Sequence, residues 1–578
     1  MNTGFTLKRV VEYSAVFNDK PNDLDSFLSG IKRSRILNAV AFFLGFSNRN
    51  SKYESHKEFI SMFFCAENNE LANEIYQKLE QTKFNPNEEL IIINPLTGLQ
   101  LFEFCFNNLN EEETQTEAEA ERNIFKAILF QNEQNTIAQN KSAESTKKLD
   151  SNIKLASLAL TQSFAYNDII NYEKGEVLAC QMIKSIYLFE FLESREDTKY
   201  LLAKFLAYFE TENWKDYLKS VLPIAFSVIQ AENEAHTDII VDSQKDSFEK
   251  DCEFIEKLIV KDVEELNDFD FIKLRSNPLY KVKNGVYRII YGLFIIELLH
   301  KGLYFKLSEL NRKLKKSQKV KGEFRGFYCD EFSEKYLLYR IMDSIYENRY
   351  IKFSGEQIKA LNVSAEPDYY IRNGNNVLLF ESKDILVNAK IKHTYDFEKY
   401  EAAFKKKLYY DEEDGKIEKK AVLQLLNNIE RILDKELPHD NNYKSNSIKI
   451  YPILVLHDHQ FNISGLNLII NNWFQDELEK LKNKGYNISK IRPITIIDID
   501  TFIYYQDYLR NRTLKLEKVI DEYYKFITFD RKKKYRDEDH AKQHVQRTLI
   551  PFSIFLSNYV TERKIPKMLK EKGYLLFD

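Results

Sequence analysis

Two acidic residues and a lysine lie close together in residues 366–383, which read EPDYYIRNGNNVLLFESK. Two short strand-like runs, residues 369–371 and 377–380, flank the turn-forming sequence RNGNN, and this pattern predicts a β-hairpin. Asp368 precedes the first strand and Glu381 follows the second. The hairpin therefore places one carboxylate at the open end of each arm.

The turn of this hairpin can be placed in two registers. A turn at residues 374–375 sets Asp368 directly opposite Glu381, and a turn at residues 373–374 makes Glu381 its diagonal neighbour. In both registers the two carboxylates lie on one face, about 5 Å apart if directly opposed and about 7–8 Å apart on the diagonal. Two carboxylates at this spacing can bind one divalent cation.

Lys383 follows Glu381 by two positions, and alternate side chains of a strand point to the same face. Two acids and one amine therefore converge at the end of the hairpin. This combination favours metal-assisted hydrolysis of a phosphate ester, because acids can hold Mg²⁺ while the cation and the lysine offset negative charge on phosphate and hydroxide.

The order Pro367-Asp368, a hairpin, and then Glu381-Ser382-Lys383 resembles the motif of the PD-(D/E)XK nuclease superfamily, the fold of many restriction endonucleases. The resemblance covers residues 320–510. It implies a Mg²⁺-dependent (endo)nuclease, with Mn²⁺ able to substitute. Asp368 and Glu381 would be metal ligands, and Lys383 would orient or activate the attacking water. DNA is favoured over RNA as the substrate, because most of the superfamily cuts DNA.

The resemblance implies two further site residues. A helix is predicted from about residue 330, and Glu334 shares its buried stripe with Leu338, Ile341 and Ile345. The first helix of PD-(D/E)XK nucleases often lends a glutamate to the metal site, which implies this role for Glu334. Glu331, one turn earlier, is the alternative.

Gln424 lies on the next predicted helix, KKAVLQLLNNIERIL, with Asn428 one turn further on. Several nuclease families of the superfamily carry a glutamine on the helix after E-x-K. The resemblance therefore implies that Gln424 positions the substrate or the lysine. A glutamine on the protein surface is the alternative interpretation.

The chain of 578 residues is long enough for several domains, and its 16 glycines and 11 prolines favour long helices. We expect a multidomain α + α/β protein, in which a largely helical N-terminal half precedes a restriction-endonuclease-like α/β domain with a mixed central sheet. The predicted parts are a mixed, mainly helical region (1–150), a helical domain (151–315), the nuclease-like domain (320–510) and a helical extension (511–578). Residues 133–152 are predicted to form a linker or exposed loop.

Charge is distributed unevenly along the chain. Residues 301–578 hold 51 Lys and Arg against 41 Asp and Glu, whereas the first 300 residues hold 33 against 47. A basic C-terminal half suits a polyanion such as nucleic acid, although the asymmetry can also serve attraction between the two halves. Residues 310–326, LNRKLKKSQKVKGEFRG, form either a domain boundary or a phosphate-facing strip. Residues 405–407 are three consecutive lysines that could contact a phosphate backbone.

Several classes of protein are excluded or disfavoured. No apolar run reaches the length of a membrane span, and the N-terminus lacks a signal peptide, so a cytoplasmic protein is expected. The five cysteines form no C-x-x-C pair, which argues against a zinc ribbon or a disulfide framework. The sequence lacks a P-loop. His457-Asp458-His459 has no evident third metal ligand nearby, so a cluster at a strand end is favoured over a metal site.

The sequence suggests three functional hypotheses. The first is the metal-dependent nuclease, whose arrangement with a helical region looks like that of prokaryotic restriction or anti-phage defence effectors. The second is a non-catalytic nucleic-acid-binding or scaffold protein with a nuclease-like fold. The third, a helical RNase using Arg536, His540 and His544, is disfavoured by their spacing. For the acidic N-terminal half, binding of a partner protein or self-association is the default expectation.

Overall fold

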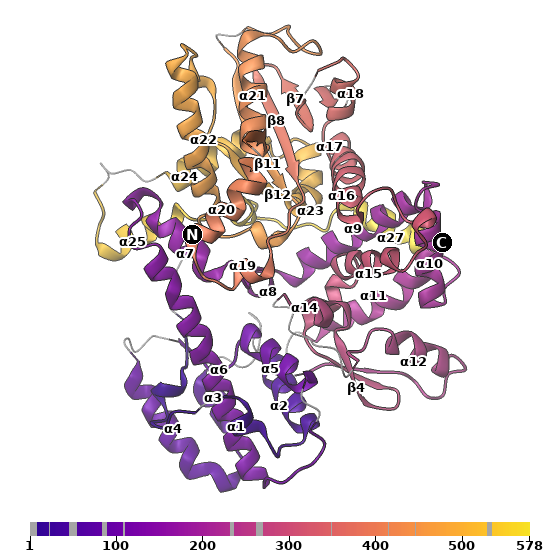
Figure 1. The fold of residues 1–578 in the computed structure, drawn as a ribbon, viewed down its shortest axis with the longest axis vertical. Helices are drawn as coiled ribbons and strands as arrows, with labels where there is room; N and C mark the ends of the chain where they lie inside the picture. The colour runs from indigo at the N-terminus through magenta and orange to yellow at the C-terminus, as the bar shows by residue number, and fades with distance from the viewer. Residues whose placement is uncertain are drawn as a thin grey trace. The chain divides into compact units, whose positions relative to one another are not determined.

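The computed structural model describes residues 8–577 apart from residues 22, 46–54, 84–88, 108–109, 232–235, 262–269, 348–349, 364, 414, 445–446 and 529–533. The chain forms two compact units (Figure 1). Unit 1 comprises residues 1–140, 172–181 and 203–310, and unit 2 comprises residues 141–171, 182–202 and 311–578. The four predicted domains divide the chain at other positions, since residues 151–315 include parts of both units, and their boundaries stay predictions.

Unit 1 is mainly helical. A short parallel pair joins β1 (Lys8–Val10) to β2 (Glu89–Ile91). The helical segments from the N-terminus to residue 145 are η1 (Tyr13–Ala15), α1 (Asp25–Leu28), α2 (Arg33–Gly45), α3 (His56–Phe63), η2 (Ala66–Asn68), α4 (Asn69–Thr82), α5 (Pro95–Asn107) and α6 (Glu117–Ser145). Those that follow, some of which continue into or from unit 2, are α9 (Lys174–Glu193), α10 (Lys199–Phe209), α11 (Trp214–Gln230), α12 (Phe248–Glu256), α13 (Ile272–Ser276), α14 (Gly292–Glu297) and α15 (Lys301–Arg312).

Helix α6 corrects one expectation. Much of the segment 133–152, predicted to be a linker or loop, belongs to this helix of 29 residues. A capping box begins it, because the Thr116 backbone N–H donates to Glu119 Oε2 (2.9 Å) and the Glu119 N–H donates to Thr116 Oγ1 (3.3 Å). The segment is polar but contains no Gly or Pro, so nothing in it breaks a helix.

A small antiparallel sheet lies in the part of the chain, residues 151–315, that was predicted to form a helical domain. Its strand order is β3-β5-β4, with β3 (Asp238–Ile240), β4 (Leu279–Lys283) and β5 (Val286–Ile289). The sequence Asn284-Gly285 forms the turn between β4 and β5, and Gly285 has a φ of +71°. An Asn-Gly turn between alternating residues is a strong hairpin signal.

A five-stranded mixed sheet forms the centre of unit 2. Its order is β12-β11-β8-β7-β6, with β6 (Ile351–Ser354), β7 (Tyr369–Asn373), β8 (Asn376–Lys383), β11 (Lys449–Leu456) and β12 (Thr495–Asp498). Strand β11 runs parallel to both β8 and β12, whereas β7 is antiparallel to β8 and β6. The expected α + α/β class with a mixed sheet is therefore confirmed.

The hairpin β7–β8 adopts the first of the two possible registers. Asn373 pairs with Asn376, and Tyr369 pairs with Phe380, so the next position sets Asp368 opposite Glu381. Gly374 has a φ of +61°, which is the left-handed conformation that this tight turn requires.

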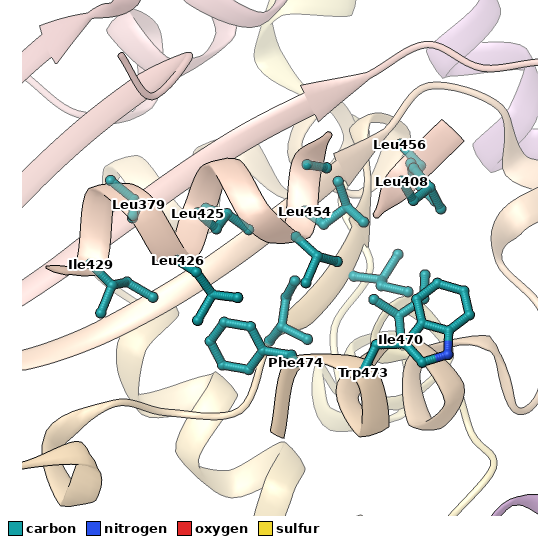
Figure 2. Close-up of a cluster of buried hydrophobic side chains, with 14 of the residues drawn as sticks. Leu379, Leu408, Leu425, Leu426, Ile429, Leu454, Leu456, Ile470, Trp473 and Phe474 are labelled. Carbon is teal, nitrogen blue, oxygen red and sulfur yellow. The ribbon is translucent and has the colours of Figure 1, made fainter. Parts of the chain in front are cut away.

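Helices cover both faces of the sheet. On one face, apolar side chains of β8 and β11 pack against α20 (Phe397–Leu408), α21 (Ala421–Asp434) and α22 (Leu466–Asn483), as Figure 2 shows for Leu379, Leu425 and Phe474. On the other face, the Phe380 ring lies 6.0 Å from the Phe502 ring of α23 (Ile499–Arg510). The side chains of Glu381 and Lys383 alternate with Phe380 and so point to the face covered by α21.

One continuous helical segment precedes the hairpin. It consists of α16 (Phe324–Phe327), a π-helix (Tyr328–Leu338) and α17 (Tyr339–Ile345), so it begins earlier than the expected position near residue 330. The other elements of unit 2 are α7 (Ser151–Ser163), α8 (Asn167–Ile170), η3 (Lys316–Gln318), α18 (Gly355–Lys359), α19 (Ala389–Lys392), β9 (Tyr410–Glu413), β10 (Lys416–Lys419), η5 (His459–Phe461), η6 (Ile488–Lys490), α24 (Leu516–Ile527), α25 (Glu538–Arg547), α26 (Phe552–Tyr559) and α27 (Lys567–Phe577). No helix in the described part of the chain combines the length and apolar character needed to cross a membrane.

Candidate functional site

The open end of the hairpin brings together three of the predicted residues. The Lys383 Nζ atom lies 2.6 Å from Glu381 Oε1 and 3.9 Å from Asp368 Oδ2. The backbone N–H of Ser382 donates to Asp368 Oδ2 at 2.6 Å, which fixes that carboxylate against the end of β8. The backbone of Asp368 is held as well, because its carbonyl accepts the Gly355 N–H at 2.9 Å.

Burial and mutual charge shift the pKa values of Asp368, Glu381 and Lys383. The Glu381 side chain is fully buried, and burial together with the Asp368 charge raises its pKa to about 8, although Lys383 opposes the shift. Burial also raises the pKa of Asp368, against the stabilising effects of Lys383 and the Ser382 N–H. Burial alone would lower the pKa of Lys383, but the carboxylates of Glu381 and Asp368 outweigh it and raise that pKa. Lys383 is therefore the cation that balances the two acids.

One oxygen of the site has no partner. Within the described residues, Glu381 Oε2 is buried and makes no hydrogen bond. An unsatisfied buried carboxylate oxygen is costly, at roughly 1–3 kcal/mol or more for a charged group. A cation bound beside it would supply the missing interaction, because hard divalent cations prefer oxygen ligands. The donor set of this site therefore fits Mg²⁺.

Glu334 joins the site from the π-helix. Burial raises its pKa to about 8, and the charge of Asp368 contributes to the rise while Lys383 opposes it. The Tyr339 hydroxyl donates a long hydrogen bond to Glu334 Oε1 (3.4 Å). The alternative residue, Glu331, contacts Arg195 and Lys335 instead, at 2.8 Å each. Of the two candidates on this helix, Glu334 is the one coupled to the carboxylate pair.

Gln424 lies on α21, the helix that covers the Glu381 face of the sheet. One turn later, the side-chain amide of Asn428 donates to the carbonyl of Ala365 at 3.1 Å, in the loop that leads to Asp368. Gln424 Oε1 and Asn428 Oδ1 are both buried and have no hydrogen-bond partner among the described residues. This edge of α21 therefore presents two free acceptors near the loop before Asp368, and the structure gives no direct contact between Gln424 and the carboxylates.

The residues that anchor the end of β8 were not predicted from the sequence. Asp384, the residue after Lys383, accepts hydrogen bonds from Ser333 Oγ and Arg325 Nη2, each at 2.6 Å. Cys329 Sγ donates to the Asp384 carbonyl at 3.3 Å. Arg325, Cys329 and Ser333 follow one another at intervals of four on the helix that carries Glu334. Their regular spacing was a visible signal, but their common partner, Asp384, lies about 50 residues further along the chain, just after β8.

His457 anchors the same strand end from the other side. Its Nε2 atom lies 2.7 Å from Ser382 Oγ, and β11 brings it there because Leu456 pairs with Lys383. Burial lowers the pKa of His457 to about 4, so the ring is neutral at pH 7. His459 Nε2 instead contacts the Asp168 carbonyl at 3.0 Å. The two histidines therefore have separate protein contacts.

Lysines 405–407 differ in their surroundings. Lys405 pairs with Glu401 at 3.0 Å, and Lys406 pairs with Asp411 at 3.4 Å. Lys407 is exposed and has no ion pair within the described residues, and its charge acts on Cys329. Of the three lysines, Lys407 is therefore the exposed one whose charge acts on a residue that contacts Asp384, next to the end of β8.

No protein-family model matches the chain, and neither the curated proteins nor the solved structures include a match.

Proposed function

We propose that the protein is a metal-dependent nuclease of the PD-(D/E)XK type that hydrolyses phosphodiester bonds, with DNA favoured over RNA. The observation that carries the proposal is the geometry at the open end of the hairpin, where Asp368 stands opposite Glu381 and Lys383 contacts both. The mixed sheet, with a preceding helix that brings Glu334 to the same place, supports it.

Asp368, Glu381 and Glu334 would hold Mg²⁺ or Mn²⁺, which supplies Lewis acidity toward the phosphodiester group when bound. Ser382 orients Asp368 through its backbone N–H. The Lys383 ammonium group can donate to a phosphate oxygen or orient the attacking water, and thereby stabilise the charge that develops on the phosphate. Gln424 is assigned to positioning the substrate, since its buried carbonyl oxygen is free to accept a hydrogen bond.

A buried site with fixed charges suits a reaction as slow as the hydrolysis of a phosphodiester. Phosphate esters hydrolyse so slowly in water that enzymes must lower the barrier by on the order of 20 kcal/mol. Electrostatic stabilisation by fixed charges in a water-poor site is the largest single contribution that proteins make to such barriers. The buried carboxylates and Lys383 provide this kind of environment.

Cleavage assays test the proposal. The wild-type protein and its Asp368→Asn variant would be incubated with duplex DNA, single-stranded DNA and RNA in Mg²⁺, Mn²⁺ or EDTA. Asp396→Asn is the matched control, because Asp396 caps α20 and is not part of the site. We expect cleavage that needs metal, is lost in Asp368→Asn and is retained in Asp396→Asn. Cleavage that persists in EDTA or in Asp368→Asn would overturn the proposal.

A further inference from the structure

A strongly basic segment leads into the helix that carries Glu334. Residues 312–321, hereafter the basic strip, contain six cations and no acid, and all six side chains are exposed: Arg312, Lys313, Lys315, Lys316, Lys319 and Lys321. Many surface lysines of this protein pair with a carboxylate, as Lys480 does with Glu477 at 2.5 Å. Within the described residues, no ion pair forms at Arg312, Lys315, Lys316, Lys319 or Lys321. The strip therefore presents positive charge at five positions that no ion pair of the described residues neutralises, although the charge of Lys321 acts on Asp197.

The backbone of the basic strip is held in place. Asn311 is buried, and its carbonyl accepts the Leu314 N–H at 3.2 Å while its Oδ1 accepts the Val320 N–H at 3.3 Å. Residues 316–318 form a 3₁₀ turn, and the Val320 side chain is buried. Because alternate side chains of an extended segment point to the same side, burying Val320 turns both Lys319 and Lys321 outward. The charges are thus displayed on an anchored surface.

The basic strip is connected to the catalytic strand end. Four residues after Lys321, Arg325 donates to both the side chain and the carbonyl of Asp384, at 2.6 and 2.8 Å. Asp384 directly follows Lys383. Lys407, whose charge acts on Cys329, adds a further cation beside the same loop. Arg325 therefore ties the helix that follows the basic strip to the residue next to Lys383.

We propose that the basic strip binds the phosphate backbone of the nucleic acid that enters the site at Lys383. This inference rests on the proposed nuclease function and assigns a substrate-binding surface to it. Lys319 and Lys321 are two positions apart in extended chain, about 6–7 Å, which is comparable to the distance between successive phosphates of one strand. Contacts of lysine with phosphates position a nucleic acid without reading its sequence.

An acidic protein fits the strip less well. The centres of protein–protein interfaces are poor in lysine and rich in aromatic side chains, and hot-spot residues are mainly Trp, Tyr and Arg. The basic strip contains five lysines and no aromatic residue. Its composition therefore matches an extended polyanion better than a folded partner.

Binding measured without cleavage tests the proposal. In a Lys383→Met background with Mg²⁺, the triple variant Lys316→Gln, Lys319→Gln, Lys321→Gln would be compared with the unmodified background by fluorescence anisotropy on labelled duplex DNA, single-stranded DNA, RNA and polyglutamate. The matched control is Lys480→Gln, Lys482→Gln, Lys484→Gln, which removes the same charge from the end of α22, where each lysine has a carboxylate partner. Thermal melting would show that all variants are folded.

The expected result is at least about tenfold weaker binding of nucleic acid by the strip variant, with little change in the control. The slope of log K against log salt should become shallower by about 0.9 for each lysine that contacts a phosphate of B-DNA, and so by up to about 2.7. Equal nucleic-acid binding by the strip variant and the control would overturn the proposal. So would a loss confined to polyglutamate, or no binding of nucleic acid by the unmodified background.

The outcomes separate this inference from the proposed function. If the wild-type protein cuts none of the substrates but binds nucleic acid through the basic strip, the proposed binding surface is supported and the proposed nuclease function is refuted. If the wild-type protein cuts nucleic acid only with metal, and the strip variant shows the same affinity and the same salt slope as the unmodified background, the nuclease function is supported and the binding surface is refuted.

Discussion

Lys383 balances the charge of two buried carboxylates. It lies 2.6 Å from Glu381 and 3.9 Å from Asp368, and both acids have a raised pKa because they are buried. In the proposed reaction this lysine stabilises charge on the phosphate, whereas the acids hold the metal. The two roles can be separated by substitution.

Lys383→Met should reduce the single-turnover cleavage rate by about 10²- to 10³-fold, which is the loss seen when one transition-state donor is removed. Methionine keeps much of the length of the side chain and lacks its charge. Binding of Mg²⁺ should persist, because the carboxylates remain. A variant that cuts at the wild-type rate, or that loses Mg²⁺ binding while staying folded, would contradict this division of roles.

His457 makes the folded state sensitive to acid. Burial lowers its pKa from 6.5 to about 4, while Asp384 and Asp500 raise it and Lys184 and Arg325 lower it. Because the unfolded chain binds a proton more readily than the folded one, the stabilisation is fully present above pH 6.5 and is lost as the pH falls toward 4. The total contribution to the free energy of unfolding is about 3 kcal/mol, because lowering a pKa by one corresponds to about 1.4 kcal/mol.

Urea unfolding at pH 7 and pH 5 would measure this effect. The wild-type protein should lose more stability between the two values than His457→Gln, whose side chain does not titrate. Ser382→Ala is the companion variant, because it removes the partner of His457 and keeps the imidazole. An identical pH dependence in the wild type and His457→Gln would show that His457 does not titrate as its burial implies.

At the scale of elements, the hairpin and the helix before it position the site. The hairpin could be predicted from local chemistry, since the turn residues and the alternating strands are contiguous in the sequence. The choice between its two registers could not, because both keep the acids on one face. The π-helix could not be predicted from the sequence either, because the apolar residues that follow Glu334 are spaced as in an α-helix.

Substitutions of the two glutamates on the π-helix distinguish a residue of the proposed site from a residue that forms surface ion pairs. Glu334→Gln should lower activity and weaken Mg²⁺ binding, because Glu334 is coupled to Asp368. Glu331→Gln should leave both unchanged and alter stability by no more than about 1 kcal/mol, because it removes partly exposed ion pairs with Arg195 and Lys335. Cleavage rates and metal titrations of the two variants provide the comparison, and a larger catalytic loss in Glu331→Gln would reverse the assignment.

Gly374 lies in the turn of the hairpin in the left-handed conformation. At its φ of +61°, Gly374→Ala should destabilise the protein by about 1–2 kcal/mol, whereas Gly374→Asn should cost less, since Asn tolerates the left-handed region. No atom lies within 4 Å of the position that a Cβ would occupy, so a clash does not contribute. Equal destabilisation by Ala and Asn in thermal melting would show that backbone conformation is not the cause.

At the scale of the whole molecule, unit 2 is built from separate stretches of the chain. Residues 141–171 contribute Leu160 and Phe164 to the core under the sheet, where the Phe164 ring lies 5.1 Å from Phe404. The predicted nuclease-like domain, residues 320–510, lacks this segment. No local pattern marks such a contribution, because the partners are more than 200 residues apart in sequence.

Residues 311–578 expressed alone should therefore fold poorly, bind a hydrophobic dye and melt without a sharp transition. In the full chain, Phe164→Ala should cost about 3–5 kcal/mol, whereas Ile170→Ala, at a position that is 38% exposed, should cost far less. A fragment 311–578 that melts as cooperatively as the full chain would show that residues 141–171 are dispensable for the core.

Binding of the metal ion is the sharpest test of the proposed site at the hairpin, because it needs no knowledge of the substrate. Isothermal titration of Mn²⁺ and Mg²⁺ into the wild-type protein and the Asp368→Asn variant would measure binding at the hairpin. We expect saturable binding by the wild type, with release of protons from the buried acids, and loss of that binding in the variant. A folded wild-type protein that binds neither ion, or a variant that binds both as the wild type does, would contradict the proposed site.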